Sequence, residues 1–260
     1  MIALDFGFGA LEHEFWRLLF VMTRIGAALV AAPLFGISSV PPQVRVIGAG
    51  AVAVLVCAWT GVVVPPALFS LAGLLAVLGE VLVGLALGFV LQLSFAAPIL
   101  AAEVIGGSMG MNMAVAVDPN SGTQSPALGQ YFAVVLTLVF LALGAHLQWF
   151  ALLVESYSTF PPGHTWLGAE RTALIASFAL RTFTTAATIA LPVCLVLLVV
   201  QLVTGVLSRS APSLNLFSLG LPAGILGGLA ALLVSAPLLT DLVVRLSHDA
   251  VTQAAEVLQP

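Results

Sequence analysis

The chain has 260 residues, of which 61% are hydrophobic and only 7% are charged, and its mean hydropathy is +1.18. A soluble domain carries about a quarter charged residues, so this composition predicts an integral membrane protein. Its seven basic residues are all arginine and its formal net charge is −4, which excludes the basic stripe that nucleic-acid binding requires.

Long apolar runs follow one another along the chain. They occupy approximately residues 18–36, 44–64, 67–100, 128–154, 173–206 and 216–240, and each is near or above the roughly 20 residues that a membrane-spanning helix needs. Clusters of proline and glycine separate them and predict turns. We therefore expect an all-α, multi-helix membrane protein with six or seven long helices.

The start of the chain and its cysteines are also informative. Residues 1–15 carry Asp5, Glu12 and Glu14 and no basic residue, so we expect the N-terminus to be retained rather than cleaved as a signal peptide. Cys57 and Cys194 each lie within an apolar run, which favours buried thiols over a disulfide.

Two runs are too long for a simple span. Residues 67–97, read as one helix, would measure about 46 Å, against a hydrocarbon core of about 30 Å. Such a helix must tilt, break or leave the bilayer. The fifth run has the same excess, and Pro192 lies where it can kink the helix.

Glu80 is a candidate functional residue because it lies deep in the third run, within GEVLVGLALGF. A carboxylate at that depth faces protein or water rather than lipid and needs a partner. Arg24 in the first run is the nearest group of opposite sign, so we favour a structural ion pair, within the chain or between subunits. A proton relay in a transporter is the alternative, although a relay usually uses several ionisable groups.

Glycines at a spacing of four residues indicate close helix packing. Gly84 and Gly88 lie on one face of the third run, and Gly106 and Gly110 have the same spacing. This spacing is frequent in membrane bundles and does not indicate a function.

The segment GGSMGMNMAVAVDPNSG, residues 106–122, carries three of the five methionines, Met109, Met111 and Met113. Methionine conforms to irregular or changing surfaces, so the segment fits a soft seal around a pore or a pliable contact with a partner. It fits equally an apolar helix end packed in a core, followed by an ordinary turn at residues 118–122. The residues alone do not decide between these readings.

Motifs for enzyme chemistry do not occur. His13-Glu14 lacks the second histidine of a zinc protease, and a phosphate-binding loop needs a lysine, which the chain does not have. The four histidines are scattered, whereas a metal site needs clustered ligands. We therefore predict no catalytic residue, no metal and no cofactor.

The order of several motifs carries a resemblance to a known family. TRIGAALVAAPLF and VPPQVR lie near the start, followed by GEVLVGLALGF, the pattern GxxMGxxxAxxVDPxxG, QSPALGQYF, GAHLQWFALLVESYSTFPPG and ALPVCLVLLVVQLVTGVLSRSAPSLNLF. Together they resemble the FliR family of flagellar export-gate proteins and its injectisome counterpart, SctT, over nearly the whole chain.

The resemblance implies a structural subunit of the type III protein export gate. With FliP-like and FliQ-like subunits it would form the pore through which unfolded flagellar proteins cross the inner membrane, next to FlhB- and FlhA-like components. The location implied is the basal body, partly periplasmic. The chain would be a single FliR-like domain, residues 1–260, with a FliP-like part at 1–172 and a FliQ-like part at 173–260.

The resemblance also implies roles for residues. The segment 106–122 would be the plug of the pore, with Arg209, Pro212 and Asn215 in a turn that faces FliQ. Relatives often carry large aromatic residues near the plug tip, where this chain has Met and Val, and glutamine is common where Ser213 stands. The alternatives are an injectisome subunit, a small-solute transporter that uses Glu80 and, more remotely, an intramembrane enzyme. The implied plug residues are Gly106, Gly107, Met109, Gly110, Met111, Met113, Val115, Val117, Asp118, Pro119 and Gly122.

Overall fold

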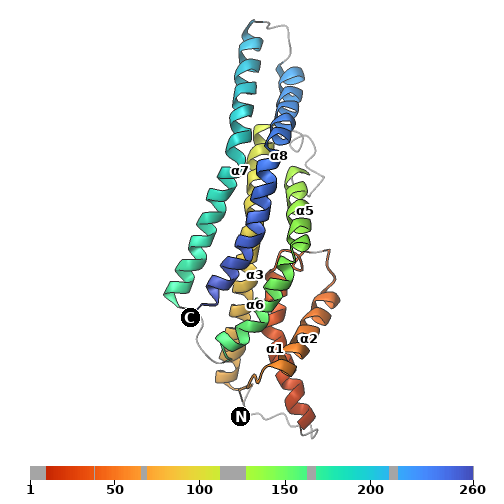
Figure 1. The fold of residues 1–260 in the computed structure, drawn as a ribbon, viewed down its shortest axis with the longest axis vertical. Helices are drawn as coiled ribbons and strands as arrows, with labels where there is room; N and C mark the ends of the chain where they lie inside the picture. The colour runs from red at the N-terminus through yellow and green to blue at the C-terminus, as the bar shows by residue number, and fades with distance from the viewer. Residues whose placement is uncertain are drawn as a thin grey trace. The chain divides into compact units, whose positions relative to one another are not determined.

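The structure is a computed structural model that describes residues 10–37, 39–65, 69–111, 127–162, 168–210 and 216–259. These residues form helices and no strands, so the predicted all-α class is confirmed (Figure 1). In chain order the helices are α1 (Ala10–Ala31), α2 (Pro42–Trp59), α3 (Leu71–Ser108), α5 (Ala127–Ala142), α6 (Ala145–Thr159), α7 (Ala169–Ser210) and α8 (Leu216–Val257).

The first two helices form a hairpin in which α1 and α2 pack side by side (Figure 1). Pro42 opens α2, where its fixed φ suits the first turn and its missing N–H is not needed. A side chain of α1 caps the C-terminal end of α2: Arg17 Nη2 donates to the carbonyls of Cys57 at 3.0 Å and Thr60 at 2.7 Å. A cation at a helix C-terminus also matches the helix dipole.

Three helices are much longer than a bilayer core. The 38 residues of α3 correspond to about 57 Å, and the 42 residues of α7 and of α8 to about 63 Å each. Each helix continues through its internal prolines, including Pro98 and Pro192. The excess length predicted for the third and fifth runs is therefore present in unbroken helices.

The fourth apolar run, residues 128–154, does not form a single helix. It is divided between α5 and α6 at Leu143 and Gly144, where Gly144 has φ +68. Glycine adopts this left-handed conformation without a Cβ clash, which explains why the helix ends there.

The chain divides into two compact units. The first comprises Met1–Ser94, Gly144–Phe178 and His248–Pro260, and the second Phe95–Leu143 and Ala179–Ser247. The core of the first includes Ile25, Leu87, Leu91, Trp149 and Leu153, and the core of the second includes Phe95, Ile105, Leu136, Phe140 and Leu197.

Among the described residues, four helices are long and apolar enough to cross a membrane: α2, α3, α7 and most of α8. The pair α5 and α6 adds a fifth if it counts as one broken span. Only 17–44% of the most apolar window of each of the four is buried inside the chain, which leaves large apolar faces for lipid or for other subunits.

Candidate functional site

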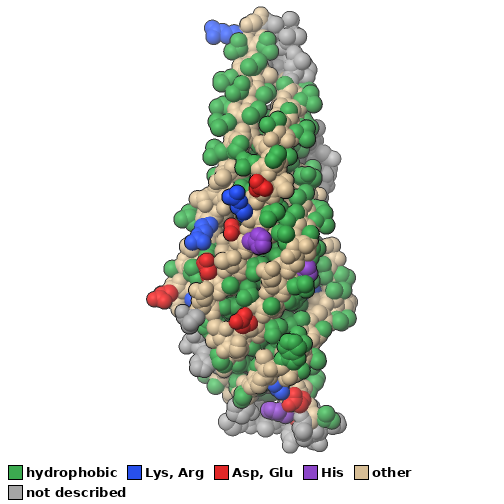
Figure 2. Space-filling view, in the orientation of Figure 1, with side chains coloured by type: hydrophobic (Ala, Val, Ile, Leu, Met, Phe, Trp, Pro, Cys, Tyr) green, Lys and Arg blue, Asp and Glu red, His purple; other side chains and the backbone are tan. Residues whose placement is uncertain are grey.

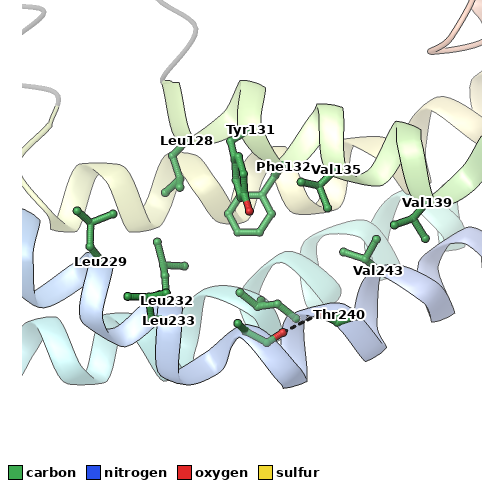
Figure 3. Close-up of a pocket in the computed structure, with 12 residues that line it drawn as sticks. Leu128, Tyr131, Phe132, Val135, Val139, Leu229, Leu232, Leu233, Thr240 and Val243 are labelled. Atoms are coloured by element: carbon green, nitrogen blue, oxygen red, sulfur yellow. Dashed lines mark hydrogen bonds between the residues drawn. The ribbon is translucent and has the colours of Figure 1, made fainter.

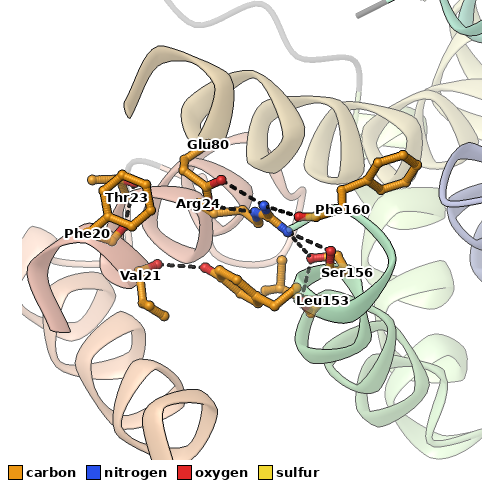
Figure 4. A network of polar contacts seen from close by, with 9 residues as sticks. Phe20, Val21, Thr23, Arg24, Glu80, Leu153, Ser156 and Phe160 are labelled. Carbon is orange, nitrogen blue, oxygen red and sulfur yellow. Dashed lines mark hydrogen bonds and ion pairs between the residues drawn. The ribbon is translucent and has the colours of Figure 1, made fainter. Parts of the chain in front are cut away.

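The most strongly built polar centre of the first unit surrounds Arg24 (Figure 4). Its Nε and Nη2 donate to the two carboxylate oxygens of Glu80, each at 2.8 Å. Its Nη1 donates to the carbonyl and hydroxyl oxygens of Ser156 at 2.7 and 3.0 Å, and Nη2 also donates to the carbonyl of Phe160 at 2.8 Å. These five bonds equal the number of N–H donors that a guanidinium has.

The centre is closed to solvent. The side chains of Arg24 and Glu80 are 1% and 3% exposed, and the Tyr157 ring lies 4.1 Å from the guanidinium carbon. The Tyr157 hydroxyl donates to the Val21 carbonyl at 2.7 Å. These bonds tie α1, α3 and α6 together through one arginine.

This geometry favours the structural ion pair over the proton relay. A bidentate, fully hydrogen-bonded pair compensates the desolvation of both charges, whereas either charge alone would be costly to bury. Among the described side chains bonded to this pair, none supplies a second carboxylate or a histidine for a relay. The centre therefore fits a joint between helices better than a proton path.

Gly84 and Gly88 continue the face of α3 that carries Glu80. A Cβ at Gly84 would collide with the carbonyl oxygen of Arg24, and a Cβ at Gly88 would lie 2.5 Å from the carbonyl oxygen of Ala28. The two glycines thus let the backbones of α1 and α3 approach closely, which brings Arg24 within reach of Glu80.

The first residues of the predicted loop are placed at the end of α3, in the second unit. Gly106 and Gly107 are helical, and the helix ends at Ser108. Gly110 has φ +82 and donates to the Gly107 carbonyl, while the Met111 N–H donates to the Gly106 carbonyl, both at 3.0 Å. These two bonds form a Schellman cap, for which a glycine with positive φ is the preferred residue.

Met109 lies inside the second unit rather than on its surface. It is 3% exposed, and it packs against Gly224 and Gly228 of α8. Met111 is partly exposed. The remaining candidates of this segment lie outside the described residues: Met113, Val115, Val117, Asp118, Pro119 and Gly122.

The predicted FliQ-facing turn is described only at Arg209, which is exposed in the last turn of α7. A cation there matches the negative end of the helix dipole. Pro212 and Asn215 lie outside the described residues. Within the described ranges no group of three His, Cys, Asp or Glu side chains is placed to hold a metal ion.

A cavity of about 510 Å³ lies between α5 and α8 in the second unit (Figure 3). Its volume falls in the range of small-molecule pockets, about 300–1,000 Å³. Only Tyr131 and Thr240 bring hydroxyls to its lining, and the Thr240 hydroxyl donates to the Ala236 carbonyl within its own helix. Such a lining offers little to a polar solute, so the cavity does not favour the transporter alternative.

Four residues of these sites were not predicted from the sequence: Ser156, Phe160, Gly224 and Gly228. Ser156 and Phe160 contribute mainly backbone carbonyls, which no residue type marks in a sequence. Gly224 and Gly228 have the four-residue spacing of packing glycines, so that signal was available. Their partner Met109 could not be read from the spacing.

Comparison with known proteins identifies the family. Residues 15–250 match the family described as bacterial export proteins, family 1. Flagellar biosynthetic protein FliR of Escherichia coli (strain K12) is 30% identical over 248 residues, which cover 95% of this chain and 93% of the relative. The FliR protein of Bacillus subtilis (strain 168) is 33% identical over 215 residues, which cover 80% and 81%.

A third relative agrees in extent: FliR of Caulobacter vibrioides (strain ATCC 19089 / CIP 103742 / CB 15) is 30% identical over 217 residues, 83% of this chain and 86% of its own length. The similarity covers α1 to α8, including the helices that carry Arg24, Glu80 and Met109. The chain therefore belongs to family 1 of the bacterial export proteins.

Proposed function

We propose that this chain is the FliR-like subunit of a flagellar type III protein export gate, without catalytic residues of its own. With FliP-like and FliQ-like subunits it forms the pore through which unfolded flagellar proteins cross the inner membrane, beside FlhB- and FlhA-like components. The observation that carries the proposal is similarity along nearly the whole chain to proteins named for flagellar biosynthesis. The location is the inner membrane within the basal body, with a part on the periplasmic side.

Exposed apolar surface supports a chain that contacts lipid or other subunits. Apolar side chains cover much of the face shown in Figure 2, where charged groups are sparse. An apolar patch of this extent marks a contact with membrane or protein. The apolar side chains of α7 that are more than half exposed include Leu191, Leu195, Leu198, Val199, Leu202, Val203, Val206 and Leu207.

The same proposal assigns different roles to the two parts of the chain. Residues 1–172 act as the FliP-like part and residues 173–260 as the FliQ-like part, so that one chain closes a position between the two kinds of subunit. The turn with Arg209, Pro212 and Asn215 then faces FliQ.

Deleting the gene is expected to abolish flagella and to stop the appearance of hook and filament proteins in the medium, because the pore lacks one subunit. A plasmid copy should restore both, and the tagged chain should co-purify with FliP-like and FliQ-like proteins. Loss of secreted virulence effectors with normal flagella would assign the chain to an injectisome instead. Solute uptake by the purified chain alone would favour the transporter.

The pore seal is a separate part of the proposal. We place it after Gly110, because Gly106 to Ser108 are helical and Met109 is buried. In this proposal Met111 and Met113 supply adaptable apolar side chains, and Val115 and Val117 supply stiffer ones.

Deleting residues 112–117, which leaves the cap at Gly110 intact, is expected to give a complex that assembles but leaks ions and small solutes. Protein export continues, because substrates must displace the seal in any case. Membrane conductance and sensitivity of cells to small toxic solutes are the measurements. A complex that assembles and stays as impermeable as the parent would place the seal elsewhere.

A further inference from the structure

We propose that Met109 is a positioning residue that anchors the end of α3 on α8 and stays seated during export, rather than a moving part of the pore seal. The contacts that carry this inference lie within the second unit. Only its last step, the effect on export, rests on the proposed function.

The seat for Met109 is a hollow made by two glycines one helical turn apart. A Cβ built on Gly228 would lie 2.5 Å from Met109 Cγ and 2.7 Å from both Sδ and Cε. A Cβ on Gly224 would lie 2.9 Å from the Met109 carbonyl oxygen. Real Cβ atoms do not approach other atoms this closely, so both positions need glycine for Met109 to lie where it does.

A second helix holds the same residues. Gln201 Nε2 of α7 donates to the Ser108 carbonyl at 2.9 Å, and Ser108 Oγ lies 3.7 Å from Cys194 Sγ of α7. Ser108 is the last helical residue of α3, so its carbonyl has no partner within the helix. The glutamine supplies that partner from the neighbouring helix.

The part of α8 that carries the two seat glycines also packs against α7. Val200 Cγ2 lies 2.9 Å from the Cβ position of Gly227, next to the seat glycine Gly228 and beside Gln201 in sequence. The helix end, its capping glutamine and the glycine hollow therefore form one packed junction of three helices. Met109 is held at backbone and side chain alike.

The adjacent methionine shows the contrast within the same segment. Met109 is 3% exposed, whereas Met111, on the far side of the Gly110 cap, is partly exposed. A change of backbone direction at Gly110 separates the two side chains. Two methionines only two positions apart therefore lie in different environments, one buried and one accessible.

A steric exchange tests the packing. Gly228→Val should lower the Tm of the purified complex because its side chain occupies the place of Met109. Met109→Ala should lower the Tm because it leaves a cavity. The double variant should recover most of the loss, since the valine then fills the space that the methionine leaves.

Gly220→Ala is the matched control in the same helix, because no described atom outside the nearby helix backbone lies within 4 Å of its Cβ position. It should leave the Tm unchanged or raise it. Additive losses in the double variant, or a Gly228→Val protein as stable as the parent, would overturn the anchor.

A disulfide tests whether the anchor stays seated. Met109→Cys with Gly228→Cys, in a chain carrying Cys57→Ser and Cys194→Ser, should cross-link on oxidation in cells that export. The cysteine sulfur takes the place of Met109 Cγ, beside the Gly228 Cβ position. We expect a high yield of cross-link and export equal to that of the same cells with reductant, and the cysteine-free chain controls for the oxidant.

Export that stops on oxidation and resumes on reduction would show that Met109 must leave its seat, and would overturn the proposal. Failure to cross-link in an assembled complex would overturn the contact itself. Both the cross-link and the Tm are read without any export activity. A chain that cross-links and shows steric rescue but has no part in flagellar export would contradict the proposed function and still support the contact between Met109 and Gly228.

Discussion

Replacing Glu80 with alanine is expected to destabilise the subunit strongly, by about 3–5 kcal/mol, because Arg24 would keep its charge in a buried site without a counter-ion. The guanidinium would lose two of its five hydrogen bonds, while Ser156 and Phe160 offer only neutral oxygens. The measurements are the Tm of the purified complex and the yield of the chain in membranes.

Removing both charges should lower the stability of the subunit less than removing one. Arg24→Met with Glu80→Met replaces the pair by apolar side chains that can still pack between α1 and α3, and such replacements of buried pairs are often neutral. Glu14→Ala is the matched control, because Glu14 forms an ion pair with Arg17 at 3.3 Å but its side chain is 59% exposed. Exposed pairs contribute about 0–1 kcal/mol. Equal losses for Glu80→Ala and Glu14→Ala would refute the buried pair as a stabilising joint.

Glu80→Gln separates the structural pair from the proton relay. The amide keeps the shape of the side chain and one acceptor oxygen but cannot carry a proton. If Glu80 is structural, export should fall only in proportion to the amount of assembled complex. A complex at parental yield and Tm that no longer exports would establish Glu80 as a proton carrier.

The sequence predicted the helical class because apolar runs of membrane-spanning length are visible in the order of its residues. It did not predict where the fourth run breaks. The break depends on the conformation of one glycine, Gly144, and the chain has 24 glycines. Helix ends at such positions follow from tertiary packing, which a local pattern does not contain.

One part of the polar centre around Arg24, the ion pair, was predictable from the sequence. A buried carboxylate demands a partner, and the first run offered only one arginine, so the proposed partner of Glu80 could be named. The backbone carbonyls of Ser156 and Phe160 are present at every residue, so no residue type in the sequence marks them as partners of Arg24. For Met109 the sequence left two readings open, a soft seal and an apolar helix end packed in a core, and it gave no sign that the residues around Met109 in space are glycines of α8.

Gly84→Ala is expected to have the second large effect, because the added methyl would overlap the Arg24 carbonyl oxygen. A carbonyl in the middle of α1 cannot rotate aside as a flexible side chain can, so the two helices must separate. Overpacking of this kind costs about 1–3 kcal/mol. Separation also stretches the hydrogen bonds between Arg24 and Glu80, which adds to the loss.

The control for this substitution lies five residues away in the same helix. The methyl group of Gly79→Ala would meet no described atom within 4 Å outside the nearby helix backbone, so the variant should gain the better helix propensity of alanine, up to about 1 kcal/mol relative to glycine. Gly88→Ala should resemble Gly84→Ala, since its Cβ would lie 2.5 Å from the Ala28 carbonyl oxygen and 2.6 Å from the Ala31 methyl. The Tm of the purified complex should therefore rise slightly for Gly79→Ala and fall for the other two. If Gly84→Ala instead matches Gly79→Ala, α1 and α3 do not pack backbone to backbone, and the pairing of Arg24 with Glu80 loses its geometric basis.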